Sequence, residues 1–264
     1  MSKATYLEYK VIVTKVLLTL IYFIFCHRKA VSRLSLHGLT DIRAFQISLW
    51  YMGRSKKGTL LRFFYTAQLN GQKCFVKVAT NDKTIKREIF INKYIAQTGL
   101  SFVPKLLLSD EAYADNTVLL VTELLLNTSK FKLPKNEQDF ESLCREFECI
   151  HESLRKLDII HGDINASNII LDQDNHIILI DFGISWAPGS EIYPEDHINN
   201  PGTYYQSSIT NSDSIRIYDN AFSFLEMLKD CDISFAFTNK ECYKRIERLV
   251  GTHTYTVRLP KEHC

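Results

Sequence analysis

Residues 161–168, HGDINASN, and residues 180–183, IDFG, are the two motifs on which the interpretation of this sequence rests. Between them stand two apolar runs, joined by the turn-forming residues 172–175. Short apolar runs bounded by turn residues are typical of buried strands. We therefore expect a β-hairpin with Asp181 at its end, close to the first motif.

The polar residues of the two motifs suit phosphoryl transfer. The transition state of that reaction spreads negative charge over the moving group, so catalysis depends on a metal ion, on positioning and on a carboxylate that accepts the hydroxyl proton. We expect Asp163 to be this catalytic base. Asn168 and Asp181 would offer oxygen ligands to Mg²⁺, which keeps water and substrate phosphates as its other ligands.

HGDINASN followed by IDFG resembles the catalytic loop and metal loop of the eukaryotic-like protein kinase superfamily, and its HGD form is similar to small atypical protein kinases and lipopolysaccharide kinases. The resemblance implies an α+β, bilobal fold with a small N-lobe of five antiparallel strands and one helix, and a mostly helical, shortened C-lobe. It implies ATP and Mg²⁺ as cofactors. We expect residues 1–44 to form an N-terminal helix and linker, 45–123 the N-lobe and 124–264 the C-lobe.

Hydrophobic periodicity upstream of the motifs predicts the elements of the small lobe. Alternating residues predict a hairpin over 59–79 with its turn at Asn70-Gly71, and isoleucines at helical spacing predict a helix over 82–98. The remaining strands are expected at 45–52, 104–108 and 117–122. Five strands result.

Lys77 lies in an otherwise apolar strand, where an unpaired ammonium would be costly. Glu88 in the following helix is the acid expected to pair with it and to direct it at phosphates. The resemblance supports this assignment, because both residues fall where the family has its strand lysine and helix glutamate. A lysine at the exposed rim of an edge strand is the alternative.

Other nucleotide contacts are expected around the same strands. Gly53 and Gly58 stand where the family has its glycine-rich loop, although the GxGxxG pattern is absent. Backbone groups from Glu123 to Leu125 are expected to form hydrogen bonds with the edge of the adenine ring. Phe75 stands where the family usually has alanine, and its bulk would narrow the adenine pocket.

Downstream residues carry further resemblance. An amphipathic helix is expected over 136–157 and a buried helix over 218–228. The resemblance implies supporting roles for His161, Gly183, Thr203 and Asp219. By that resemblance, Thr203 contacts the catalytic aspartate, and Asp219 holds the backbone of the catalytic loop around His161 and Gly162. A helix N-cap is the alternative role of Asp219.

Because of two departures from the family's pattern, the sequence does not identify the acceptor of the phosphoryl group. Gly162 replaces the usual arginine, so control through a phosphorylated activation loop is not expected, and no Ala-Pro-Glu closes the activation segment. A serine/threonine-type protein kinase is the first hypothesis. A lipopolysaccharide or saccharide kinase is the alternative, and a pseudokinase scaffold is a second one.

Composition narrows the partners and the compartment. A formal net charge of +2 gives no reason to expect nucleic-acid binding. Seven cysteines without a CxxC pair favour a reducing interior and a cytoplasmic location. The apolar run at 11–26 with flanking basic residues indicates either a helix on the inner face of a membrane, through residues 1–30, or one packed on the domain. His37, His197, His253 and residues 251–264 are expected at the solvated surface.

Overall fold

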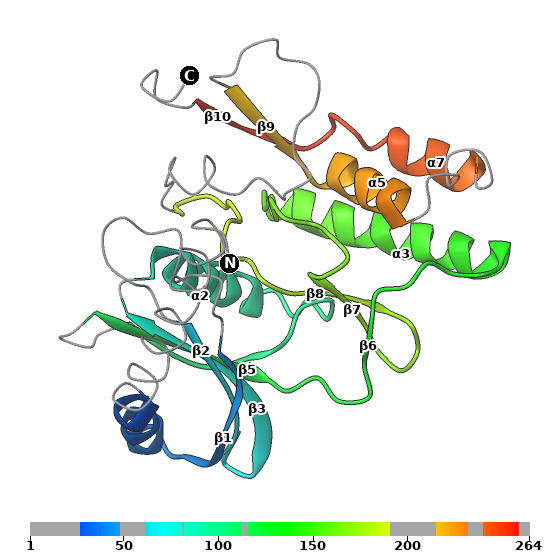
Figure 1. Ribbon diagram of the computed structural model, residues 1–264. Coiled ribbons are helices and arrows are strands. Elements are labelled where there is room, and N and C mark those ends of the chain that lie inside the picture. The colour runs from blue at the N-terminus through cyan, green and yellow to red at the C-terminus, as the bar shows by residue number, and fades with distance from the viewer. Residues whose placement is uncertain are drawn as a thin grey trace, which may run out of the picture. The chain divides into compact units, whose positions relative to one another are not determined.

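The computed structural model describes residues 27–47, 62–80, 82–111, 116–190, 215–231 and 240–258. These divide between two compact units, the first within Met1–Ile85 and Leu106–Leu124, the second within Lys86–Lys105 and Leu125–Cys264 (Figure 1). Gly53, Gly58, Thr203 and the apolar run at 11–26 lie outside the described residues, so the expectations made for them stay predictions.

Unit one contains a five-stranded antiparallel sheet in the order β1-β2-β3-β5-β4, as expected. The strands are β1 (Leu39–Ile47), β2 (Arg62–Leu69), β3 (Gln72–Thr80), β4 (Leu106–Asp110) and β5 (Thr117–Glu123). Strand β1 begins at Leu39 rather than at Phe45. Two register irregularities within it, and the positive φ of 49° at Asp41, break the alternation that would have revealed this start.

The hairpin of β2 and β3 has the predicted turn, in which Asn70 and Gly71 take φ values of 52° and 80°. One face of the sheet is apolar and includes Tyr65 and Val76, which are fully buried. Residues 27–36 form a helix that packs on this face. Nδ1 of His27, the first described residue of this helix, lies 3.1 Å from the Tyr65 hydroxyl.

Helix α2 (Lys83–Ala96) confirms the helix expected over 82–98. Asp82 caps its start, because one carboxylate oxygen accepts hydrogen bonds from the backbone N–H groups of Thr84 (3.0 Å) and Ile85 (3.2 Å). The same buried carboxylate forms an ion pair with Arg62 of β2. Burial is the largest single effect and raises the pKa of Asp82, but Arg62 and the hydrogen bonds from Thr84 and Ile85 together lower it below its ordinary value.

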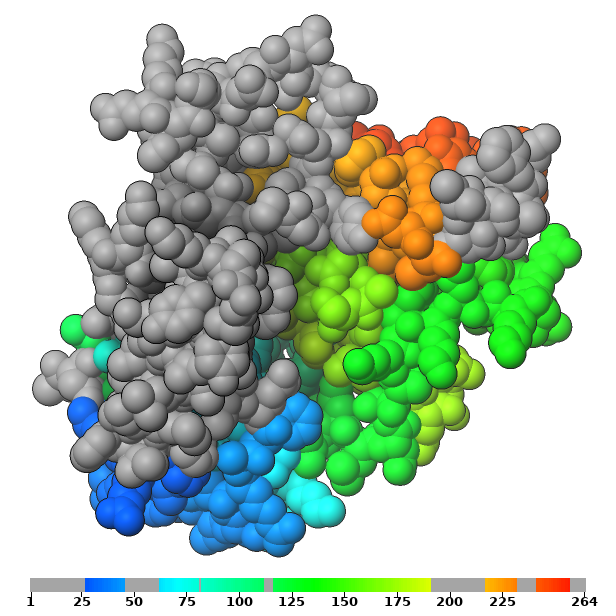
Figure 2. Space-filling model, in the orientation of Figure 1, coloured from blue at the N-terminus to red at the C-terminus, as the bar shows by residue number. Residues whose placement is uncertain are grey.

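Unit two contains residues 86–96 of α2 and three further helices among the residues that the structure describes. Its elements are β6 (Ser129–Lys130), α3 (Glu137–Lys156), β7 (Ile169–Leu171), β8 (Ile177–Leu179), β9 (Ile215–Asp219), α5 (Asn220–Cys231), α7 (Lys240–Glu247) and β10 (Thr254–Arg258). Asn136 caps α3, and the rings of Phe147 and Phe224 stack with centroids 3.8 Å apart. Figure 2 shows the orange surface of α5 directly against the green surface of α3. This core supports the hairpin of β7 and β8.

Helix α3 and the β7–β8 hairpin confirm the elements expected on either side of the catalytic loop, and α5 confirms the helix expected after it. Helix α7 and the β9–β10 pair were not expected. Within the part of the chain that the structure describes, no helix combines the length and the apolar character needed to span a bilayer.

Candidate active site

Every backbone polar group from Ile159 to His161 has a partner, so the chain enters the catalytic loop in a defined position. Ile160 exchanges two hydrogen bonds with Trp186, at 2.9 and 2.8 Å. Asn220 accepts from the His161 N–H (2.9 Å) and donates to the Ile159 carbonyl (3.2 Å). Ser185 Oγ donates to the His161 carbonyl (2.7 Å), and the Ile159 N–H donates to the Leu154 carbonyl.

The contact made by Asn220 corrects the role expected of Asp219. Asp219 is the N-cap of α5, with Oδ1 accepting from the N–H groups of Ala221 (2.8 Å) and Phe222 (3.0 Å). Its other oxygen accepts from the Gly251 N–H. The neighbouring amide holds the loop because it can accept and donate at once, whereas a carboxylate could satisfy only the N–H.

Gly162 is required by the backbone. Its φ is 76°, and a Cβ there would lie 3.0 Å from the Ile184 carbonyl oxygen. A residue with a side chain would therefore be strained in conformation and crowded in space. This explains why arginine does not stand at this position in this chain.

His161 is buried and neutral. Its Nε2 lies 3.0 Å from the Ile180 carbonyl, which can only accept, and its Nδ1 lies 3.3 Å from the Asp163 N–H, which can only donate. The proton therefore sits on Nε2. Burial lowers the pKa of His161 to about 4. The ring also contacts Phe182, with centroids 4.5 Å apart, so that His161 links the two motifs.

The Asp163 carboxylate is held by two amides. Asn165 Nδ2 donates to Oδ1 and Asn168 Nδ2 donates to Oδ2, each at 2.9 Å. Asn168 Nδ2 also lies 2.9 Å from the Asp163 carbonyl. Because both of these bonds use its nitrogen, the side-chain oxygen of Asn168 is the atom oriented away from Asp163.

Asp181 lies near the same place. The Ile180 N–H donates to the Asn168 carbonyl (3.0 Å), which ties the end of the hairpin to the loop. Asp181 itself has a φ of 63°, a left-handed conformation that aspartate tolerates better than most residues. Burial and the negative charge of Asp181 raise the pKa of Asp163 to about 7. The two carboxylates are thus close enough to repel each other.

This donor set fits a hard cation. It offers an amide oxygen and two mutually repelling carboxylates, and Mg²⁺ binds such oxygen ligands together with water and phosphate. Among the described residues no group of three or more His, Cys, Asp or Glu is placed to hold a metal ion. A cation here would therefore take further ligands from Asn168, from water or from a substrate.

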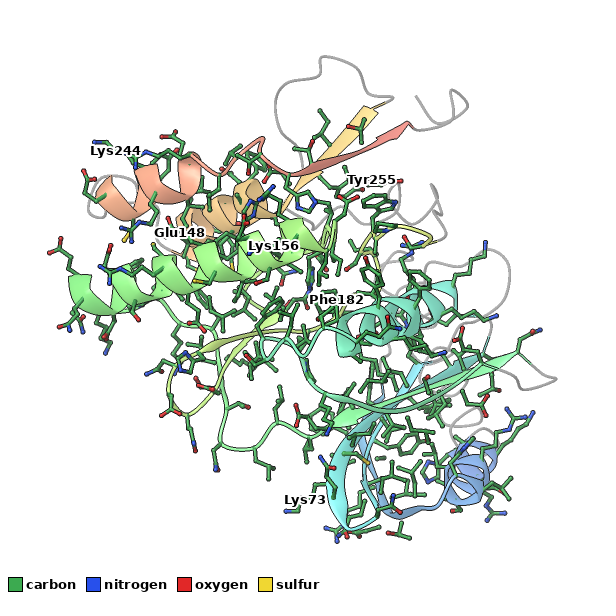
Figure 3. All side chains as sticks on the ribbon, turned by 180° about the vertical axis from the view of Figure 1, so that it is seen from behind. Lys73, Glu148, Lys156, Phe182, Lys244 and Tyr255 are labelled. Carbon is green, nitrogen blue, oxygen red and sulfur yellow. The ribbon has the colours of Figure 1, made fainter. Side chains whose placement is uncertain are left out.

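The segment after the second motif is held by several contacts. The buried Arg87 of α2 donates to the Gly183 carbonyl (3.3 Å), and the Ser185 N–H donates to the Phe182 carbonyl (3.1 Å). Figure 3 labels Phe182 among the side chains of this region. The expected supporting position of Gly183 thus has a defined backbone contact.

Lys77 and Phe75 lie on one face of β3, opposite the apolar core face of unit one. The Phe75 ring stacks on Phe64 (centroids 5.9 Å apart) and meets Phe45 edge to face (5.6 Å). Glu123 ends β5. The aromatic ring in place of the family's alanine is therefore part of a three-ring cluster.

Glu88 lies on α2 with 5% of its surface exposed, and its backbone carbonyl accepts from Asn92 Nδ2 (2.8 Å). Leu125 is half-buried in unit two. The pairing of Lys77 with Glu88 and the adenine contacts of Glu123 and Leu125 stay predictions.

Comparison with known proteins agrees with the two motifs. Residues 111–192 match the family described as ABC1 atypical kinase-like domain. The chain is 29% identical over 131 residues to mouse hormonally up-regulated neu tumor-associated kinase, which covers 46% of this chain and 18% of that protein. It is 32% identical over 124 residues to human serine/threonine-protein kinase LATS1, or 44% of this chain and 10% of the relative.

A shorter match, 40% identical over 55 residues, is to serine/threonine-protein kinase Warts of Drosophila melanogaster, and covers 19% of this chain and 5% of that protein. The chain thus spans less than a fifth of the length of each of these relatives. These matches confirm the resemblance to the protein-kinase-like superfamily that was inferred from HGDINASN and IDFG.

Proposed function

We propose that this protein transfers the γ-phosphoryl group of ATP to a hydroxyl group, with Asp163 as catalytic base and Asn168 and Asp181 as magnesium ligands. The observation that carries the proposal is the gathering of these three side chains in unit two, within a chain of the protein-kinase-like superfamily. Bound Mg²⁺ would neutralise phosphate charge.

The contacts of Asp163 support its role. Asn165 and Asn168 each donate to a different carboxylate oxygen, so the group is held in one orientation before any acceptor binds. A base must lie within hydrogen-bond reach of the proton it accepts, and a preset orientation reduces the cost of reaching that geometry. His161 contacts the backbone at Asp163 and Ile180, and Gly162 allows the backbone conformation that the loop requires.

The remaining contacts of the nucleotide are proposed from the residues that the resemblance to the family points to. In this proposal unit one is the small lobe and unit two the large lobe of a bilobal fold, with Lys77 paired to Glu88 and directed at the phosphates. Gly53 and Gly58 would line the phosphates, and the backbone at Glu123 and Leu125 would bind the adenine.

A serine or threonine hydroxyl of a protein is the proposed acceptor, because two of the relatives are named serine/threonine-protein kinases. A cytoplasmic location is part of the proposal. For residues 27–36, burial of Ala30 and Leu34 against the sheet supports a helix that packs on the domain rather than on a membrane.

Purified protein incubated with labelled ATP, Mg²⁺, generic protein substrates and cell-envelope saccharide extracts tests the proposal. We expect label on protein hydroxyls, and a loss of about a thousandfold in turnover for Asp163→Ala, because this change removes a direct transition-state role. Label on saccharide alone would support the saccharide kinase. Label on neither, with Asp163→Ala indistinguishable from wild type in cells, would support a scaffold and reject catalysis.

A further inference from the structure

Residues 251–256, the turn before β10 and the first part of that strand, run beside the residues that hold the catalytic loop. Strand β10 pairs antiparallel with β9, with Thr254 opposite Asp219 and Tyr255 opposite Tyr218. The Gly251 N–H donates to Asp219 Oδ2 (2.6 Å). This segment is therefore attached to the residue that precedes Asn220, the amide that binds the loop backbone.

Two buried histidines attach the same segment to α3 and to the entrance of the loop. His253 Nε2 lies 3.1 Å from Asp158 Oδ1, and His151 Nε2 of α3 lies 3.1 Å from Thr252 Oγ1. The two rings meet at a centroid distance of 6.3 Å. The expectation that His253 lies at the solvated surface is wrong, because only 8% of it is exposed. Asp158 is where the chain turns into the loop, with a φ of 54°.

Tyr255 makes the third attachment. Its ring stacks on Trp186 with centroids 4.5 Å apart and an interplanar angle of 13° (Figure 3). Trp186 is the residue that exchanges two backbone hydrogen bonds with Ile160. Ile160 and Tyr218 are each only 1% exposed and form one cluster with the two stacked rings. The stack thus covers the bridge between the catalytic loop and the segment after Asp181.

We propose that residues 251–256 act as a C-terminal latch that positions the catalytic loop, with Tyr255 as its main positioning residue. The bridge between Ile160 and Trp186 is a single pair of hydrogen bonds, without a continuous strand on either side. Such a pair opens readily when water reaches it, and the stacked ring excludes water from it. Loss of the ring would let the loop and the segment separate, which would displace the Asp163 carboxylate.

Hydrogen exchange tests the latch without reference to catalysis. We compare Tyr255→Ala with Tyr255→Phe, which keeps the stacked ring, and with Tyr243→Ala, a matched control on α7 whose ring lies against Lys229 instead. In Tyr255→Ala the amides of Ile160 and Trp186 should exchange at least about tenfold faster while those in the middle of α3 are unchanged. Tyr255→Phe should restore protection, and Tyr243→Ala should leave Ile160 and Trp186 unaffected.

Kinetics form the second readout, and this one rests on the proposed function. Tyr255→Ala should lower kcat about tenfold while the KM for ATP stays within about twofold, because small displacements of catalytic groups reduce turnover more than binding. Tyr255→Phe should recover kcat.

The outcomes separate the two proposals. Faster exchange at Ile160 and Trp186 in a protein without any phosphotransfer activity would support the latch and reject the proposed function. Unchanged exchange at both amides would overturn the latch, whatever the activity. Equal loosening of α3 and the loop would also overturn it, because Tyr255 would then only stabilise unit two as a whole.

Discussion

The sheet of unit one and the catalytic loop of unit two are stabilised in different ways. The sheet is held by continuous ladders between five strands and by an apolar face under a helix, so that each residue is supported by many neighbours. The loop is held by separate contacts, some between backbone groups and some from single side chains, of which those of Asn220 and Ser185 are examples. Single substitutions in the loop should therefore affect activity, and single substitutions in the sheet should affect stability.

The ion pair of Arg62 and Asp82 is the sharpest test within unit one, because it is a buried polar contact in a region otherwise held by apolar packing. Arg62→Ala would leave the Asp82 carboxylate buried without this partner. We expect a loss of about 3 kcal/mol in the free energy of unfolding, measured by chemical denaturation.

Arg43→Ala is the matched control, since Arg43 pairs with Asp41 at an exposed site of the same sheet. Its loss should stay below about 1 kcal/mol. Equal effects of the two substitutions would contradict the account of a buried, stabilising pair.

Asn220 is the corresponding test in unit two. Asn220→Ala leaves the Ile159 carbonyl and the His161 N–H without this partner. The backbone at the start of the catalytic loop should therefore no longer be held in one position. We expect kcat to fall about thirtyfold, or ~2 kcal/mol in transition-state stabilisation. Asn220→Asp can still accept from His161 and should lose less.

Asn136→Ala is the control for Asn220, because it removes an N-cap of α3 and should cost about 1 kcal/mol of stability without changing kcat. A variant Asn220→Ala with normal turnover would show that the loop does not depend on this amide.

The pH dependence of stability offers a smaller test. Asp82 has a lowered pKa in the folded protein, so its charge stabilises the fold above the pKa of the unfolded chain. This contribution is lost as the pH falls through the folded value, that is, on acidification below about pH 4. Asp82→Asn should show a weaker loss of stability over that range than wild type, by thermal unfolding. Parallel curves would exclude Asp82 as the source.

Regular elements could be predicted from the sequence because their periodicity is local. The β2–β3 hairpin, α2, α3 and the β7–β8 hairpin each show their pattern within their own residues. Strand β1 was only partly predicted, since two irregularities interrupt its alternation. The β9–β10 pair joins residues more than thirty positions apart and shows no signal in either strand alone.

The candidate site was predicted where a motif dictated the residue. Asp163, Asn168 and Asp181 were proposed in this way, and they lie in one unit, while their roles stay predictions. The contact of Asn220 was missed, because sequence spacing does not reveal which of two adjacent side chains faces the loop. The signal in the sequence was Asn220 itself, because its amide can accept a hydrogen bond from a backbone N–H and donate one to a backbone carbonyl.

The most direct test of the central claim is the binding of ATP with and without Mg²⁺ to wild type and to Asp181→Asn, measured by titration calorimetry. If Asn168 and Asp181 hold the metal beside Asp163, wild type should bind ATP more tightly with Mg²⁺ than without it. Asp181→Asn should lose most of that difference. An equal gain from Mg²⁺ in both proteins would contradict the claim that Asp181 is a ligand of the metal.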